Sequence, residues 1–83
     1  SPASATIECL LRDKRIAAEA LLIERLQRGV EQGELAANTD PAVLGKFINT
    51  VMEGMSVQAR DGATLNELLS IAKMALDRWP AAI

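Results

Sequence analysis

Few side chains in this sequence could carry out chemistry. The 83 residues contain no histidine and no tyrosine, and the single cysteine is Cys9. The chain therefore lacks an imidazole base, a cysteine pair and any cluster with metal-ligand spacing. Carboxylate pairs such as Glu31 and Glu34 are expected on exposed helix surface, where nothing would tune them for acid–base work. We expect no catalytic residue, no metal site and no cofactor, and we predict that the protein is not an enzyme.

The charge balance argues against a nucleic-acid surface in this stretch. Nine Lys and Arg against eleven Asp and Glu give a net charge of −2, whereas phosphate contacts need clustered positive charge. Three basic residues, Arg12, Lys14 and Arg15, have acidic neighbours, including Asp13 and Glu19, and are expected to form ion pairs on a helix surface. No DNA-binding residue is expected here. The lone cysteine and the lack of a long apolar run favour a cytoplasmic location with no membrane partner.

Composition and chain breakers predict an all-α fold. Helix-forming residues dominate and aromatic residues make up only 2%, which favours helix over strand. Ser1 and Asp40 can cap a helix. Pro2 and Pro41 suit its first position, and Gly33 suits the left-handed residue that ends one. Gly29 would cost about 1 kcal/mol against Ala, so fraying is expected there. We predict three antiparallel helices over residues 2–32, 40–60 and 64–79.

The third predicted helix has a clear start and stop. Thr64 and Glu67 have the spacing of a capping box, in which each side chain accepts from the other residue's free N–H group. Pro80 pushes Trp79 out of the helical region and should end the helix there.

The last two predicted helices have apolar arcs that one neighbour cannot cover. At 100° per residue, each arc spans about 160–180°, whereas packing on one helix needs only about 100°. The arc of the second helix contains Val43, Leu44, Phe47, Ile48, Val51, Met52, Met55 and Ala59. The arc of the third contains Leu65, Leu68, Leu69, Ile71, Ala72, Ala75, Leu76 and Trp79. Asn49, Thr50 and Glu53 lie outside these arcs and are expected on a solvated face.

The first predicted helix behaves differently, because its apolar stripe moves around the helix along its length. A helix of 30 residues is about 45 Å long, against about 30 Å for one of 20 residues. Its N-terminal half should therefore extend beyond its two partners and face something outside this chain. A self-contained three-helix bundle is the alternative, but so small a chain buries only about 60–65% of its unfolded surface. The wide arcs favour a second copy, with each subunit giving two helices to a four-helix interface.

Several segments, in order, resemble one family of proteins. ERLQRGVEQGEL at residues 24–35 is similar to the end of the seventh helix of tetracycline-repressor-type (TetR) transcriptional regulators. GMSVQARDGAT at residues 54–64, followed by Glu67-Leu68-Leu69, resembles the eighth helix, turn and ninth helix. ALDRWP at residues 75–80 is similar to a frequent ending. The resemblance covers residues 16–80, although Ala36 stands where a proline often follows the leucine.

The resemblance implies a role that composition could not indicate. Such regulators bind operator DNA through an N-terminal helix-turn-helix domain, and their C-terminal domain dimerises and usually encloses an effector pocket. Residues 1–83 would be the C-terminal part of that effector-binding and dimerisation domain. The DNA-binding domain would lie upstream of Ser1. The implied partners are a second copy, a small-molecule effector and operator DNA, and a repressor is expected. A stand-alone helical dimerisation module with no ligand sensing is the alternative.

The interface and the pocket can be assigned to residues. Gln58 is the most informative, because a polar amide within an apolar arc could meet its symmetry mate across a two-fold axis. Ile48 and Met52 are the candidates for the effector pocket, since methionine adapts to varied ligands. The candidate dimer interface consists of Phe47, Val51, Met55, Gln58, Leu68, Ala72, Ala75 and Trp79.

Overall fold

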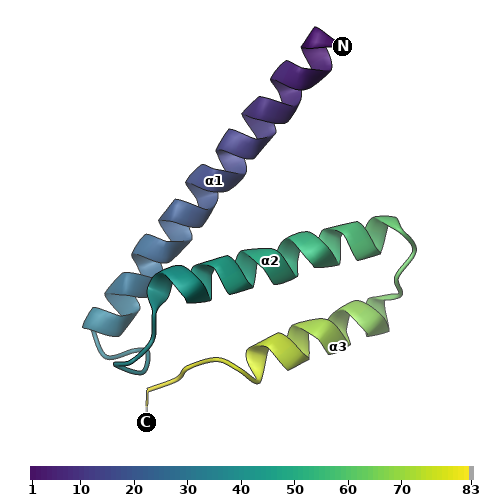
Figure 1. Ribbon diagram of the computed structural model, residues 1–83. Coiled ribbons are helices and arrows are strands. Elements are labelled where there is room, and N and C mark those ends of the chain that lie inside the picture. Colours follow the sequence, from purple (N-terminus) through teal and green to yellow (C-terminus); the bar gives the residue numbers. More distant parts are fainter. Residues whose placement is uncertain (83) are drawn as a thin grey trace.

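Three α-helices make up the computed structural model, which describes residues 1–82 (Figure 1). Helix α1 runs from Pro2 to Glu31, α2 from Pro41 to Arg60, and α3 from Leu65 to Leu76. Within the described residues the β-structure consists of an isolated antiparallel bridge between Leu35 and Ala81. The all-α prediction is confirmed, and the bounds of the first two helices agree with it to within one residue.

Each helix begins with the cap that its sequence indicates. The Ser1 hydroxyl accepts from the Ser4 amide at 3.2 Å. The Asp40 carboxylate accepts from the amides of Ala42 and Val43 at 3.0 and 3.3 Å. At α3 the capping box is complete: the Glu67 amide donates to the Thr64 hydroxyl at 3.1 Å, and the Thr64 amide donates to the Glu67 carboxylate at 2.8 Å. These bonds satisfy amides that have no partner inside the helix.

Helix α1 ends in a left-handed glycine turn. Gly33 has φ = 78°, its amide donates to the Val30 carbonyl at 3.2 Å, and the next amide, Glu34, donates to the Gly29 carbonyl at 2.8 Å. This pair of bonds is the Schellman motif. The expected fraying at Gly29 is wrong, because Gly29 is buried and α1 continues to Glu31. Its missing side chain leaves room for Leu35, whose Cδ1 would lie 3.2 Å from a Cβ at position 29.

Helix α3 ends three residues earlier than predicted, at Leu76 rather than at Trp79. The Trp79 amide still donates to the Leu76 carbonyl at 3.0 Å, but this is a bond of the tighter three-residue type. The Pro80 carbonyl then accepts from the Ala36 amide at 2.8 Å. The C-terminal tail thus leaves the helix and runs beside the loop that follows α1. Pro80 has no N–H to donate to the Leu76 carbonyl, so the regular helical bonding cannot continue there.

The helices form one layer rather than a bundle. Helices α2 and α3 lie antiparallel, whereas α1 crosses the first half of α2 and then diverges from it toward the N-terminus (Figure 1). In the described part of the chain α1 contacts α2 but not α3. The principal extents are 51 × 30 × 13 Å and the radius of gyration is 15.5 Å. A compact chain of this length would have a radius of about 12 Å. The smallest extent is thus close to the 10–12 Å diameter of one helix.

The core is correspondingly small. Leu26 and Leu35 are the buried large apolar residues, at 6% and 5% exposure. The accessible surface is 6484 Å², whereas a folded monomer of 8.9 kDa has about 4,800 Å². All the large apolar residues in the first 18 positions of α1 are exposed, as expected for the overhanging half of that helix. Much of the apolar side-chain surface therefore has no neighbour within residues 1–82.

Candidate functional site

Helices α1 and α2 cross at a glycine. A Cβ at Gly45 would lie 2.5 Å from Cγ1 of Ile23, so no larger residue fits there unless the helices move. Gly45 is buried, and the side chain of Ile23 occupies the space above its backbone. This contact was not predicted from the sequence. The available signal was a glycine inside a strongly apolar helix, where it costs about 1 kcal/mol and so indicates close packing.

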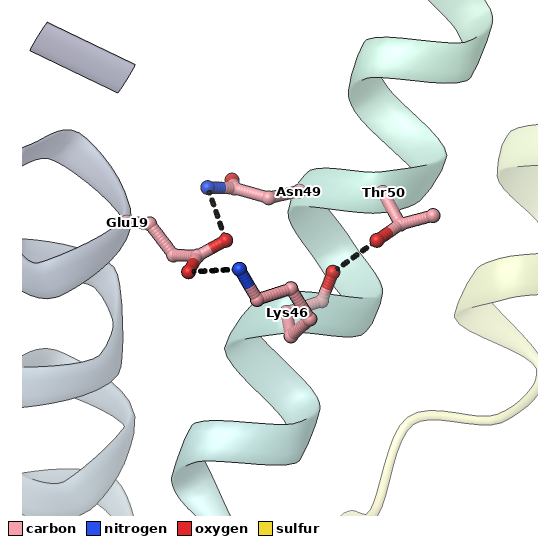
Figure 2. Close-up of polar contacts among 4 residues, drawn as sticks. All are labelled: Glu19, Lys46, Asn49 and Thr50. Atoms are coloured by element: carbon pink, nitrogen blue, oxygen red, sulfur yellow. Dashed lines mark hydrogen bonds and ion pairs between the residues drawn. The ribbon is translucent and has the colours of Figure 1, made fainter. Parts of the chain in front are cut away.

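A polar cluster lies beside this crossing (Figure 2). Glu19 on α1 accepts from two residues of α2: Lys46 Nζ lies 2.8 Å from Oε2, and Asn49 Nδ2 lies 3.2 Å from Oε1. The Glu19 side chain is 19% exposed and that of Lys46 is 70% exposed. Thr50 takes no part in the link, because its hydroxyl donates to the Lys46 carbonyl at 2.7 Å. The solvated role expected for Asn49, and the pairing expected for Glu19 within its own helix, are both wrong.

The cluster shifts the ionisation of its own members. The hydrogen bond from Lys46, together with that from Asn49, lowers the pKa of Glu19 below its ordinary value. The same ion pair raises the pKa of Lys46. Both shifts favour the charged forms, because each charge is stabilised by its partner. The link between α1 and α2 is therefore ionic at neutral pH.

Two open grooves follow one another along the seam between α2 and α3. The turn-end groove lies next to the α2–α3 turn and has a volume of about 610 Å³. It is lined by Thr50, Val51, Gly54, Met55, Gln58, Ala63, Glu67, Leu68, Ser70 and Ile71. The tail-end groove lies toward the C-terminal tail and has a volume of about 320 Å³. It is lined by Leu44, Phe47, Ile48, Val51, Met52, Met55, Ala72, Ala75, Leu76, Arg78 and Trp79.

The structure divides the predicted interface residues between these grooves. Gln58 and Leu68 line the turn-end groove, and Val51 and Met55 line both. The other four predicted interface residues line the tail-end groove together with the two predicted pocket residues, Ile48 and Met52. Those four are Phe47, Ala72, Ala75 and Trp79. Residues that the sequence assigned to two surfaces thus share one depression.

Helical periodicity separates two faces of the α2/α3 hairpin. On α2, Met52 and Gly54 are 200° apart, so they lie on opposite sides of the seam with α3. On α3, Leu69 and Ile71 are also 200° apart, so they too lie on opposite sides of the seam, and both are exposed. We call the side of Gly54 and Ile71, which line the turn-end groove, the outer face. We call the side of Met52 and Leu69, toward α1, the inner face. Both faces of the hairpin are apolar and uncovered.

The remaining polar side chains do not gather into a reactive site. Within residues 1–82, no three His, Cys, Asp or Glu side chains lie where they could hold a metal ion. Cys9 is exposed on the overhanging part of α1, with Arg12 Nη2 at 3.7 Å from its sulfur. None of the helices in this part of the chain is long and apolar enough to cross a membrane.

Comparison with known proteins relates the chain to a regulator of transcription. It is 34% identical over all 83 residues to the HTH-type transcriptional repressor ComR of Escherichia coli (strain K12). The chain spans 40% of the length of that relative. It matches no protein-family profile, and no solved structure matches it. A distant homologue of this chain is therefore a transcriptional repressor.

Proposed function

We propose that residues 1–83 form the dimerisation and effector-sensing part of a TetR-type transcriptional repressor, and that an N-terminal helix-turn-helix domain of the same protein binds operator DNA. The similarity to a repressor along the whole of this chain supports the class. The ordered resemblance of residues 16–80 to the last helices of TetR-type regulators supports the family.

The matched part is not suited to reading DNA. A helix-turn-helix sets two short helices at about 90–120°, whereas α2 and α3 form an antiparallel hairpin (Figure 1). The net charge of −2 also lacks the positive excess that phosphate contacts need. The operator-binding role of the whole protein is therefore assigned to a segment outside these 83 residues.

One observation carries the proposal: the α2/α3 hairpin is a single layer with two uncovered apolar faces. Transfer of such surface out of water is favourable by about 25 cal/mol per Å², so each face needs a cover. Helix α1 can cover neither, because it contacts α2 but not α3 and diverges from the hairpin. Two different covers are required, as in a domain that packs on its own core on one side and on a second copy on the other.

The outer face suits the second copy. It lies away from α1, so a partner hairpin can approach it without meeting that helix. A Cβ at Gly54 would meet no atom of this chain within 4 Å, which lets the backbone of another helix come close. Gln58 lines the same groove, and a symmetry-related glutamine could satisfy its amide across the two-fold axis.

The inner face suits the effector. Ile48 and Met52 line the tail-end groove, whose walls are apolar apart from Arg78, and its volume of about 320 Å³ lies at the lower end of ligand pockets. The remainder of the domain would close this open depression. An effector that fits one conformation better shifts the dimer toward it and changes the spacing of the two DNA readers from about one turn of DNA.

Substitutions on one helix test the dimer. Ile71→Asp places a charge on the outer face, and it should convert the full-length protein from dimer to monomer at micromolar concentration and weaken operator binding at least tenfold. Asn66→Asp adds the same charge on the exposed N-terminal turn of α3, and it should leave the dimer and its affinity for operator DNA unchanged. Sedimentation velocity and fluorescence anisotropy with operator DNA provide the measurements. A wild-type protein that is monomeric at this concentration contradicts the proposal.

The stand-alone dimerisation module remains the second candidate, because it accounts for the outer face equally well. The two candidates differ at Met52. In a sensor, Met52→Trp fills the tail-end groove, so an apolar fluorescent probe such as anilinonaphthalene sulfonate should bind the full-length protein at least fivefold more weakly. In a module without sensing, wild type and variant should bind the probe equally, and both should dimerise.

A further inference from the structure

We propose that Glu19, Lys46 and Asn49 form a latch that sets the angle at which α1 leaves α2, and that Gly45 is the pivot beneath it. The three side chains join the two helices through hydrogen bonds and an ion pair (Figure 2). The contact of Ile23 with Gly45 lies close to these groups: on α1, Ile23 is one turn from Glu19, and on α2, Gly45 is next to Lys46 and one turn from Asn49.

The position of the latch along α1 is the first argument. Residues 1–18 are all exposed, and Glu19 is the first residue of α1 that neighbours partly cover. The latch is therefore the last point of attachment before the helix extends alone. Closer to the C-terminus, Leu26 and Gly29 are buried, so that end of α1 is held by packing rather than by polar bonds.

The pivot has the shape that a change of angle requires. Position 45 has no side chain, so Ile23 meets only the backbone of α2 there. Packing of side-chain ridges into grooves usually restricts the angle between two helices. A glycine contributes no ridge, so the restriction is weaker at this position, and the polar groups one turn further along α1 add a contact that helps to define the angle.

The latch is weak enough to open. Lys46 is 70% exposed, and an ion pair open to water is weak because water competes for both charges. Asn49 is half-buried and holds the other carboxylate oxygen, so the two donors fix Glu19 in one orientation. Added salt screens the ion pair but leaves the hydrogen bond from the Asn49 side chain to Glu19. We therefore expect added salt to open the latch in part rather than completely.

A small opening would be amplified along α1. From Ile23 to Pro2 the helix extends about 32 Å, so a 10° rotation at the pivot moves its N-terminal end by about 5 Å. Taken with the proposed function, on which this consequence rests, the arm leads toward the part of the protein that precedes α1. The latch itself requires only the geometry of the described residues.

Distance measurements in the full-length protein test the latch. Any cysteine outside these 83 residues is replaced, and spin labels are placed on Cys9 and on Ser56→Cys, far from the crossing on α2. Wild type should give a narrow distance distribution at about 50 mM salt that broadens at about 1 M salt. Glu19→Gln should broaden it at least twofold at low salt and abolish the salt response.

Two further variants make the result specific. Glu24→Gln is the same change five positions along α1, at an exposed residue, and should leave the distribution and its salt response unchanged. The charge exchange of Glu19→Lys with Lys46→Glu should restore the narrow distribution, because Asn49 can offer its carbonyl to the new lysine. A distribution that is indifferent to Glu19→Gln, or one that the exchange fails to narrow, overturns the latch.

The latch and the proposed function fail in different experiments. The distances between the labels do not depend on operator DNA or on an effector. A monomeric protein with salt-sensitive distances would refute the dimeric repressor and keep the latch. A dimer that binds operator DNA but has salt-insensitive distances would refute the latch and keep the dimeric repressor.

Discussion

Ile23 and Gly45 meet so closely that a Cβ at position 45 would lie 2.5 Å from Cγ1 of Ile23. The isoleucine is stiff at its first torsion, so it cannot move aside without moving α1. The close approach of α1 to α2 at this point thus depends on one missing methyl group.

Gly45→Ala should destabilise the protein despite the better helix propensity of alanine. Overpacking costs about 1–3 kcal/mol and the propensity gain returns about 1 kcal/mol, so we expect a net loss of up to about 2 kcal/mol. Denaturant unfolding of the full-length protein measures it. In an Ile23→Ala background the same substitution should be neutral or stabilising, and an equal loss in both backgrounds would contradict the packing argument.

Leu35 and Gly29 should behave as a coupled pair. Leu35→Ala removes a side chain that is 5% exposed and should cost about 2–3 kcal/mol. Gly29→Ala places a Cβ 3.2 Å from Leu35 Cδ1 and should destabilise wild type. Once Leu35 is alanine, the added methyl group has room and should recover up to about 1 kcal/mol. A double-mutant cycle measures the coupling, and strictly additive effects would count against the contact.

The capping box of α3 can be tested alone. Thr64→Ala removes the acceptor of the Glu67 amide and should lower the unfolding free energy by about 0.5–2 kcal/mol. Ser56→Ala on α2 is the control, because the Ser56 hydroxyl bonds back to the Met52 carbonyl, adds no stability there, and lines neither groove. If the two substitutions have the same effect on the melting temperature, the capping box does not contribute measurably to stability.

Acid should weaken the structure through two glutamates. The pKa of Glu67 is lowered, chiefly because its carboxylate accepts from the Thr64 amide, and that of Glu19 is lowered by Lys46. A depressed pKa in the folded state contributes stability above the unfolded pKa of about 4.3, and this is lost as the pH falls through the folded value. Melting temperatures from pH 6 to pH 3 should fall less steeply in the Glu19→Gln, Glu67→Gln double variant than in wild type.

Local features were predictable, and contacts between distant residues were not. The caps at Ser1, Asp40 and Thr64 follow from residues within three positions of each other, so the sequence alone identified them. The pairing of Glu19 with Asn49 joins positions 30 apart, and no periodicity indicates which polar residues will meet. The bond from the Ala36 amide to the Pro80 carbonyl likewise joins residues far apart in the chain.

The sequence predicted that α2 and α3 have uncovered apolar residues, but not how these residues are grouped into surfaces. The wide apolar arcs predicted uncovered surface on α2 and α3, and the exposure of Leu69 and Ile71 agrees with this. The apolar arc of one helix does not indicate which of its residues line the same groove as residues of another helix. Phe47 and Met52 were therefore assigned to different surfaces, although both line the tail-end groove.

A molecule only 13 Å thick is almost all surface, so its folding is inseparable from its associations. If these 83 residues were produced alone, their melting temperature should rise with protein concentration, because self-association stabilises the folded state by mass action. Stability measured at one dilution would describe the mixture of species present rather than the chain. Substitutions on α2 and α3 would then change solubility as readily as they change folding.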